Sequence, residues 1–172
     1  MWQAPVILVV TGTHHQPFDR LLRAADDIAR ELGELVVAQV GPSSLSLPHC
    51  AIHRSFPPGE LEQRMEEARI VVIHGGTSSF LAARALGRRP IVVPRRRAHR
   101  EHVDDHQVEF AARLPAEEAI VAEPETLRAA VRSFTEERPS SGDPDRRSRV
   151  FAELLESTVE SLFRGDAGPK PP

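Results

Sequence analysis

Two short segments of the chain combine glycine, histidine and hydroxyl residues, the types that bind phosphate groups and transfer protons. The first is Gly12-Thr13-His14-His15, and the second is His74-Gly75-Gly76-Thr77-Ser78-Ser79. Glycines let the backbone come close to an anion, and the first turn of a helix offers unpaired N–H groups and a positive dipole end. A glycine turn followed by a serine or threonine cap would give the same pattern in the second segment. Phosphate binding and a plain helix start are therefore both open there.

His14 and His15 are also candidates for a general base, because histidine titrates near neutral pH. Two adjacent histidines alone do not make a metal site, which needs a third ligand at a suitable spacing. A plain polar loop is the simpler interpretation of this pair.

Three more histidines, His99, His102 and His106, lie close together in the sequence. On one helix His102 and His106 would share a face, because they are four residues apart. No cysteine cluster accompanies them, so we expect no metal site here.

A run of arginines, Arg95-Arg96-Arg97 with Arg100, lies just before these histidines and among them. Such a run is typical of a solvated loop. It would also attract an anionic lipid or substrate.

Both glycine-histidine segments directly follow apolar runs rich in β-branched residues, which predict buried parallel strands. The expected strands are Val6–Val10, Leu35–Gln39, Ala51–Phe56, Ile70–Ile73, Ile91–Val93 and Ala119–Ala122. Apolar residues between them recur at three- and four-residue spacing and predict helices from about Pro17 to Leu32, Leu61 to Ala68, Phe80 to Leu86, Val108 to Leu114 and Pro124 to Phe134. The alternation indicates an α/β fold, a Rossmann-like parallel sheet with helices on both faces. Such sheets bind ligands where strands end and helices begin.

The 172 residues are enough for one domain, to which we assign residues 1–136. Residues 137–145, rich in proline, serine and glycine, are expected to form a linker. Residues 146–164 then predict an amphipathic C-terminal helix, and residues 165–172 a disordered tail. That helix either docks back on its own domain or offers its apolar face to a partner subunit.

Composition indicates which partners and which cellular compartment to expect. A net charge of −3 gives no reason to expect nucleic acid as a partner. The single cysteine, Cys50, allows no disulfide within the chain and fits a reducing compartment. The first apolar run, Val6–Val10, is too short for a signal peptide or a membrane span. We therefore expect a cytoplasmic protein that reaches the inner face of a membrane only through a partner.

Four motifs, in this order along the chain, resemble the glycosyltransferase family 28 C-terminal domain. They are Gly12-Thr13-His14-His15-Gln16-Pro17-Phe18-Asp19-Arg20-Leu21, His74-Gly75-Gly76, Gly87 with Pro90-Ile91-Val92-Val93-Pro94, and His102-Val103-Asp104-Asp105-His106-Gln107. The resemblance covers about Val6 to Leu114. It is closest to the small free-standing members, the PssE-type subunits of bacterial exopolysaccharide glycosyltransferases and the donor-binding subunit of the eukaryotic two-part GlcNAc transferase.

The resemblance implies the C-terminal half of a GT-B glycosyltransferase, which binds a UDP-sugar at the C-terminal edge of its sheet without a metal or other cofactor. It also implies a partner, a membrane-associated acceptor-binding subunit that brings a lipid-linked sugar. The implied reaction is an inverting displacement at the anomeric carbon of the sugar, with UDP leaving, in exopolysaccharide or glycolipid synthesis.

Carried over by position, the resemblance also implies site residues. Gly12 and Thr13 would border the diphosphate; the catalytic candidates, His14 and His15, come instead from their residue type and their place after the first strand. The nucleotide-sugar contacts would be completed by His74, Gly75, Gly76, Thr77, Ser78, Ser79, Asp105, His106 and Gln107.

One position departs from the family pattern. A glutamate on the helix after the glycine turn usually binds the ribose hydroxyls, but Ala82 stands at the corresponding place and no acidic residue lies between His74 and Gly87. This departure would fit weaker binding, a different donor, or a binding or scaffold module that has lost sugar transfer. Separately, a stand-alone nucleotide-binding enzyme of flavodoxin-like type stays open as an interpretation of the chain.

Overall fold

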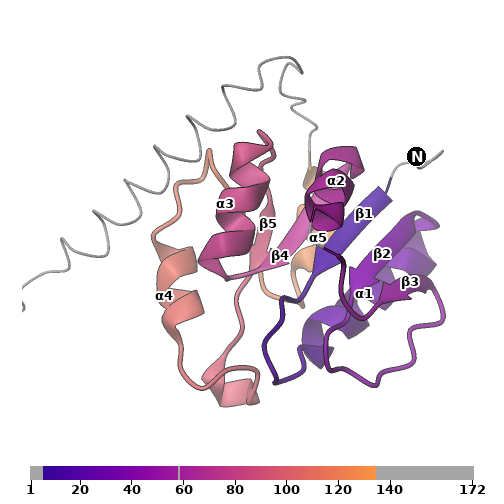
Figure 1. The fold of residues 1–172 in the computed structure, drawn as a ribbon, viewed down its shortest axis with the longest axis horizontal. Coiled ribbons are helices and arrows are strands. Elements are labelled where there is room, and N and C mark those ends of the chain that lie inside the picture. The colour runs from indigo at the N-terminus through magenta and orange to yellow at the C-terminus, as the bar shows by residue number, and fades with distance from the viewer. Residues whose placement is uncertain (1–5, 58, 135–172) are drawn as a thin grey trace, which may run out of the picture.

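The computed structural model describes residues 6–57 and 59–134, in which strands and helices alternate (Figure 1). The strands are β1 Val6–Val10, β2 Leu35–Gln39, β3 Cys50–His53, β4 Ile70–His74, β5 Ile91–Val93 and β6 Ile120–Val121. The helices are α1 Asp19–Leu32, α2 Glu60–Glu67, α3 Thr77–Ala85, α4 His106–Ala112 and α5 Leu127–Ser133, with a 3-10 turn, η1, at Arg97–His99. The predicted linker, C-terminal helix and tail (137–145, 146–164 and 165–172) lie outside the described residues.

The strands form one parallel sheet in the order β3-β2-β1-β4-β5-β6. The chain builds outward from β1 to β3, then crosses back to place β4 on the other side of β1, with Val9 beside Val72 in the register. The order of strands therefore reverses between β1 and β4, which is the point where sheets of this type bind ligands. The predicted Rossmann-like fold is confirmed.

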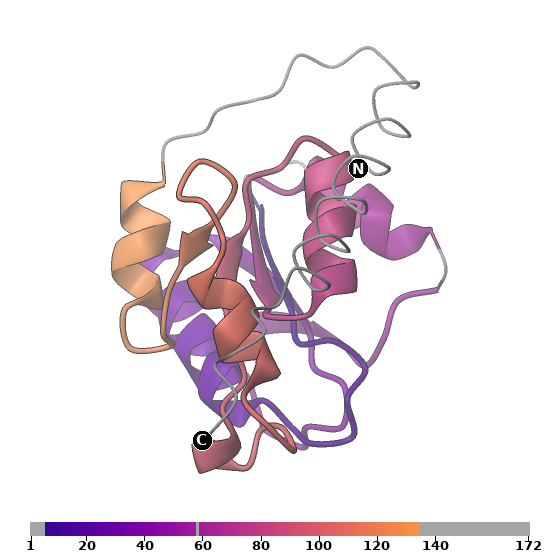
Figure 2. The same ribbon diagram turned by 90° about the vertical axis from the view of Figure 1, so that its left-hand side faces the viewer.

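Helices cover both faces of the sheet (Figures 1 and 2). Because side chains alternate along a strand, Val9 and Val72 pack with α1 and α5, whereas Leu8 and Val71 pack with α2, α3 and α4. Both sets are almost fully buried. Apolar residues on both faces are what a parallel sheet between two helical layers requires, and they explain why the strands read as continuous apolar runs.

Some element ends differ from the sequence prediction. Strand β3 ends at His53 rather than Phe56, because β2, with which it pairs, ends at Gln39, opposite His53. Helix α3 begins at Thr77, three residues before the predicted start, so the Thr77-Ser78-Ser79 segment belongs to its first turn. Among the described residues, no helix has both the length and the apolar character that crossing a bilayer requires.

Candidate functional site

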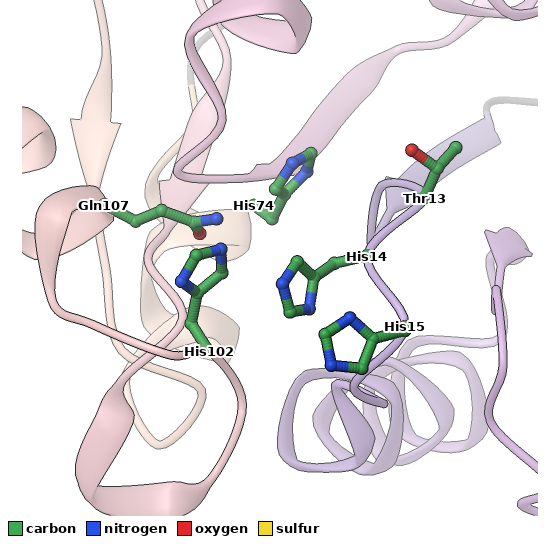
Figure 3. Close-up of a pocket in the computed structure, with 6 residues that line it drawn as sticks. All are labelled: Thr13, His14, His15, His74, His102 and Gln107. Atoms are coloured by element: carbon green, nitrogen blue, oxygen red, sulfur yellow. The ribbon is translucent and has the colours of Figure 1, made fainter.

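Three loops meet at the C-terminal edge of the sheet and surround a cleft of about 480 Å³. They are the β1–α1 loop (residues 11–18), the β4–α3 turn (residues 75–76) and the β5–α4 loop (residues 94–105). The cleft is lined by Thr13, His14, His15, His74, His102 and Gln107 (Figure 3). It lies at the reversal point between β1 and β4, and none of its six lining residues is acidic.

Two glycines hold the ring of His74 between them. A Cβ atom on Gly12 would lie 2.5 Å from Cε1 of His74, and one on Gly76 would lie 2.3 Å from Nε2. Real Cβ atoms do not come this close, so a side chain at either position would require the ring of His74 to move. Gly12 also has a φ of 77°, a conformation that other residues adopt only with strain. The two glycine-histidine segments of the sequence are thus a single packing unit.

A similar close approach fixes the other wall of the cleft. A Cβ on Gly75 would lie 2.9 Å from Cβ of Gln107, so the turn after β4 packs directly on the first turn of α4. The Oε1 atom of Gln107 accepts a hydrogen bond of 3.2 Å from the backbone N–H of Arg95. This bond orients the side-chain amide of Gln107, whose nitrogen faces the cleft (Figure 3).

Arg95 does not lie in a solvated loop, which corrects one interpretation of the arginine run. Its side chain is completely buried and stacks on Phe18, with 4.9 Å between the guanidinium carbon and the ring centroid. The guanidinium donates hydrogen bonds to the backbone carbonyls of Thr11 at 2.7 Å, Gln16 at 2.8 Å and Glu101 at 2.9 Å. These bonds tie the β1–α1 loop to the β5–α4 loop across the floor of the cleft.

The β5–α4 loop is also anchored from its outer side. Arg20 on α1 forms an ion pair of 2.9 Å with the buried carboxylate of Glu101. The same carboxylate accepts the backbone N–H of Arg96 at 3.0 Å, and the Arg96 side chain pairs with Glu123. Arg96 therefore makes structural contacts too, whereas Arg97 and Arg100 are exposed.

His74 is uncharged at neutral pH. Burial, together with the charge of Arg95, lowers its pKa from 6.5 to about 4, and the backbone of Val10 opposes the shift only in part. Its Nδ1 atom is buried and has no hydrogen-bond partner within ordinary distance among the described residues. A neutral imidazole at this place offers a directed N–H donor rather than a full positive charge.

His102, which the sequence analysis left out of the site, forms part of the cleft wall. Its ring lies 4.2 Å from that of His14, which in turn lies 4.3 Å from that of His15 (Figure 3). Burial is the main cause that lowers the pKa of both His14 and His102. Repulsion by His102 is the next cause at His14, and repulsion by His106 is the next cause at His102. The sequence did place His102 close to the expected site residue Gln107. That His102 lies opposite His14, however, depends on the fold of the β5–α4 loop.

The structure brings together some of the residues expected from sequence and separates others. Thr13, His14, His15, His74 and Gln107 line the cleft, while Gly12, Gly75 and Gly76 shape its walls by close packing. Asp105 and His106 are exposed and do not line it. The carboxylate of Asp105 instead accepts the backbone N–H of Arg97 at 2.9 Å.

Helix α3 begins at the edge of the cleft without the side-chain cap that the simpler interpretation of its sequence supposed. Its N-cap residue is Gly76, and no side chain makes a capping hydrogen bond there. Thr77, Ser78 and Ser79 form its first turn. Unpaired backbone N–H groups at a helix start favour an anion. One turn further along, Ala82 packs against the apolar cluster under α3.

Comparison with solved structures places this fold among glycosyltransferases. The chain shares 21% identity with the calicheamicin glycosyltransferase CalG4, over 97% of its own length and 45% of that chain, with a TM-score of 0.56. It shares 14% identity with MurG of Acinetobacter baumannii, over 91% of its own length and 51% of that chain, with a TM-score of 0.53. With the glycosyltransferase VinC in complex with dTDP it shares 20% identity, over 94% of its own length and 41% of that chain, with a TM-score of 0.51.

At sequence identities this low, the likeness to these structures shows a shared fold and nothing beyond it. The chain spans about half the length of these enzymes or less. A search of curated proteins gave no match. The family model of the glycosyltransferase family 28 C-terminal domain, however, matches residues 6–157, well over half of the chain. Its match includes the strands and the three loops around the cleft, and the chain therefore belongs to the glycosyltransferase family 28 C-terminal domain family.

Proposed function

We propose that this chain is the donor-binding half of an inverting glycosyltransferase, and that its cleft binds the diphosphate of a UDP-sugar. The observation that carries the proposal is the cleft itself, at the reversal point of the sheet, lined by hydrogen-bond donors and by no acidic side chain. Membership of the glycosyltransferase family gives these donors a chemical purpose.

Each wall of the cleft supplies a different kind of donor to a diphosphate. The neutral ring of His74 offers one N–H, Gln107 its amide, and Thr13 its hydroxyl. The start of α3 adds backbone N–H groups and the positive end of the helix dipole. Donors held in place by buried packing stabilise negative charge that develops on the leaving diphosphate, because they need not reorganise during the reaction.

The proposed reaction needs a second lobe. An acceptor hydroxyl attacks the anomeric carbon, the bond from that carbon to the diphosphate oxygen breaks, and UDP leaves with the bonding electrons. The proton of the hydroxyl passes to a base. We assign the base and the acceptor site to a separate, membrane-associated subunit that carries a lipid-linked sugar, as in exopolysaccharide or glycolipid synthesis. Through that subunit the chain works in the cytoplasm at the inner face of the membrane.

Calorimetric titration of the chain with UDP, UDP-sugars and dTDP tests donor binding; dTDP belongs in the panel because the VinC structure contains it. We expect saturable binding of at least one of these ligands. His74→Gln should weaken it roughly 10-fold, the equivalent of one hydrogen bond to a charged group. His53→Gln, on edge strand β3 away from the cleft, is the matched control. The absence of binding by the wild type, or equal loss in both variants, would count against the proposal.

Ala82 favours a second candidate, a binding module that keeps the fold without sugar transfer. The methyl side chain of this alanine has no polar group to offer a ribose, and it packs on an apolar cluster. This candidate predicts a stable complex with the acceptor-binding chain but no transfer from any donor. Incubating the purified complex with radiolabelled UDP-sugars and a lipid-linked acceptor separates the two, since only the first candidate forms a labelled product.

A further inference from the structure

Beside the cleft, a histidine-aspartate trio consists of His102, Asp104 and His106, at every second position of the chain. One ligand atom from each residue lies within 4.8 Å of the others. The Nδ1 atom of His102 is 3.1 Å from Oδ1 of Asp104, and the Nδ1 atom of His106 contacts the same oxygen. The two imidazole rings lie 4.6 Å apart and nearly perpendicular. Two nitrogens and one carboxylate oxygen thus converge on one point.

We propose that the histidine-aspartate trio binds one transition-metal ion of the Zn²⁺ class. Ligand atoms around a tetrahedral Zn²⁺ are roughly 3–3.5 Å apart, so small rotations of three side chains close the site. Imidazole nitrogens with one carboxylate suit Zn²⁺, Co²⁺ or Ni²⁺, whereas Mg²⁺ prefers oxygen ligands only. The sequence analysis expected no metal site because no cysteine cluster accompanies these histidines; the structure places Asp104 beside them as a third ligand.

The surroundings of the trio fit this role. His106 and Asp104 are each 56% exposed, so an ion has a path from solvent, whereas the 10% exposed His102 lies in the cleft wall. His14 stacks on His102 from the cleft side, and its Nδ1 accepts the backbone N–H of Gln16 rather than facing the trio. The buried Arg95 lies close enough to His102 to repel a positive charge there, and Glu101 favours the charged form of Arg95.

Bound metal would have a definite mechanical effect. His102 belongs to the β5–α4 loop and His106 is the first residue of α4. An ion shared by them closes a loop of five residues and holds the His102 wall of the cleft to the helix that carries Gln107. The alternative is that Asp104 merely accepts hydrogen bonds from the two rings, in which case added metal changes nothing.

Metal titration of the chelator-stripped chain decides between these alternatives. With ZnCl₂ in the calorimeter we expect one ion per chain, and a rise in melting temperature on adding Zn²⁺ but not Mg²⁺. Asp104→Asn and His106→Gln should each weaken Zn²⁺ binding at least about 10-fold and remove the thermal shift. His99→Gln is the matched control, since His99 is an exposed histidine of the same loop.

Cobalt provides a readout of the ligands themselves. Co²⁺ bound by the trio should give visible absorption bands that disappear in Asp104→Asn and persist in His99→Gln. Equal Zn²⁺ affinity of the wild type and Asp104→Asn, or equal weakening by His99→Gln, would overturn the proposal. Circular dichroism of each variant shows that it is folded. Because no nucleotide enters these measurements, their result is independent of donor binding.

Discussion

At the scale of single residues, the chain uses a buried charge where most proteins use apolar packing. Among the residues that the structure describes, Arg95 is the largest fully buried side chain, and its pKa falls from 12.5 to about 10 through burial, so it still carries its charge at neutral pH. Three backbone carbonyls and the face of Phe18 surround that charge. A buried charge of this kind is stable only while its partners are held in place, so the arginine and the two loops that it joins depend on one another.

Replacing Arg95 with methionine therefore tests the junction of the loops. The variant removes the Arg95 donors from three carbonyl groups, two of them in buried hydrogen bonds, and we expect the free energy of unfolding to fall by about 2–4 kcal/mol. Urea denaturation measures the loss. Arg97→Met, an exposed arginine two residues away, should change stability by less than about 0.5 kcal/mol. Equal effects of the two substitutions would mean that the Arg95 contacts do not support the fold.

His74 makes stability depend on pH. Its pKa is about 4 in the folded chain and about 6.5 when unfolded, so the unfolded state binds a proton first as the pH falls. The stabilising effect of an uncharged His74 is complete above pH ~6.5 and is lost between pH ~6.5 and ~4. The free energy of unfolding that is lost over this pH range amounts to roughly 3 kcal/mol.

The measurement compares wild type with His74→Gln, whose side chain does not titrate, by urea denaturation at pH 7 and pH 4.5. Other groups cancel in that comparison. We expect the stability of the wild type, relative to the variant, to fall by roughly 2–3 kcal/mol at the lower pH. A constant difference at both pH values would show that His74 is not buried in its neutral form.

At the scale of elements, the glycines decide how closely strands and loops approach. Gly12 and Gly33 both have positive φ angles, but their surroundings differ. Gly33 ends α1, as its position in the sequence predicted, and a Cβ there would meet nothing within 4 Å. At Gly12 a Cβ would strike the ring of His74.

This contrast separates backbone strain from steric clash. Gly33→Ala should cost about 1 kcal/mol of stability from the left-handed conformation alone. Gly12→Ala should cost about 1–3 kcal/mol more, because the ring of His74 must move. It should also weaken donor binding, which Gly33→Ala should leave intact. Denaturation and calorimetry of the pair provide the test, and matching results for both variants would exclude the close packing seen here.

The same elements show how far sequence reasoning reaches. Apolar runs such as Val6–Val10 and Ile91–Val93 were predicted with their observed ends, because a strand buried on both faces leaves an unmistakable pattern. The parallel sheet followed from the alternation of strands and helices, and the loops after β1 and β4 were expected at one edge of it. The place of Gln107 at the same cleft was implied by the family resemblance, and the structure brings it there with Thr13 and His74.

Contacts between loops could not be predicted in the same way. Nothing in the run Arg95-Arg96-Arg97 distinguishes the completely buried arginine from the exposed one, because their positions depend on carbonyls as distant as Thr11. His102 was missed for the same reason, since its place opposite His14 is set by the path of the β5–α4 loop. Strands and helices can be predicted from the pattern of neighbouring residues, whereas the paths of the loops depend on contacts between residues far apart in the chain.

At the scale of the whole molecule, the proposed function makes the cleft one side of a reaction site. The 172 residues cover 45% of CalG4 and 51% of MurG, and all six lining residues come from the C-terminal edge of a single sheet. Displacement at an anomeric carbon needs an acceptor held on the side opposite the diphosphate and a base to receive its proton. Under the proposed function, the donors in this cleft serve the diphosphate, and the acceptor and base come from the second lobe.

These 172 residues alone should therefore bind the donor without transferring its sugar. Mixed with a UDP-sugar and a lipid-linked acceptor, the purified chain should release UDP no faster than the buffer does, while calorimetry shows the cleft to be occupied. Adding the acceptor-binding chain should start transfer, and Gly12→Ala should slow it in proportion to the lost donor affinity when the donor is below saturation. Radiolabelled product in the extracted lipid measures the reaction. Transfer by the chain alone would show that it holds both substrates, and the acceptor site would then have to be sought on its own surface.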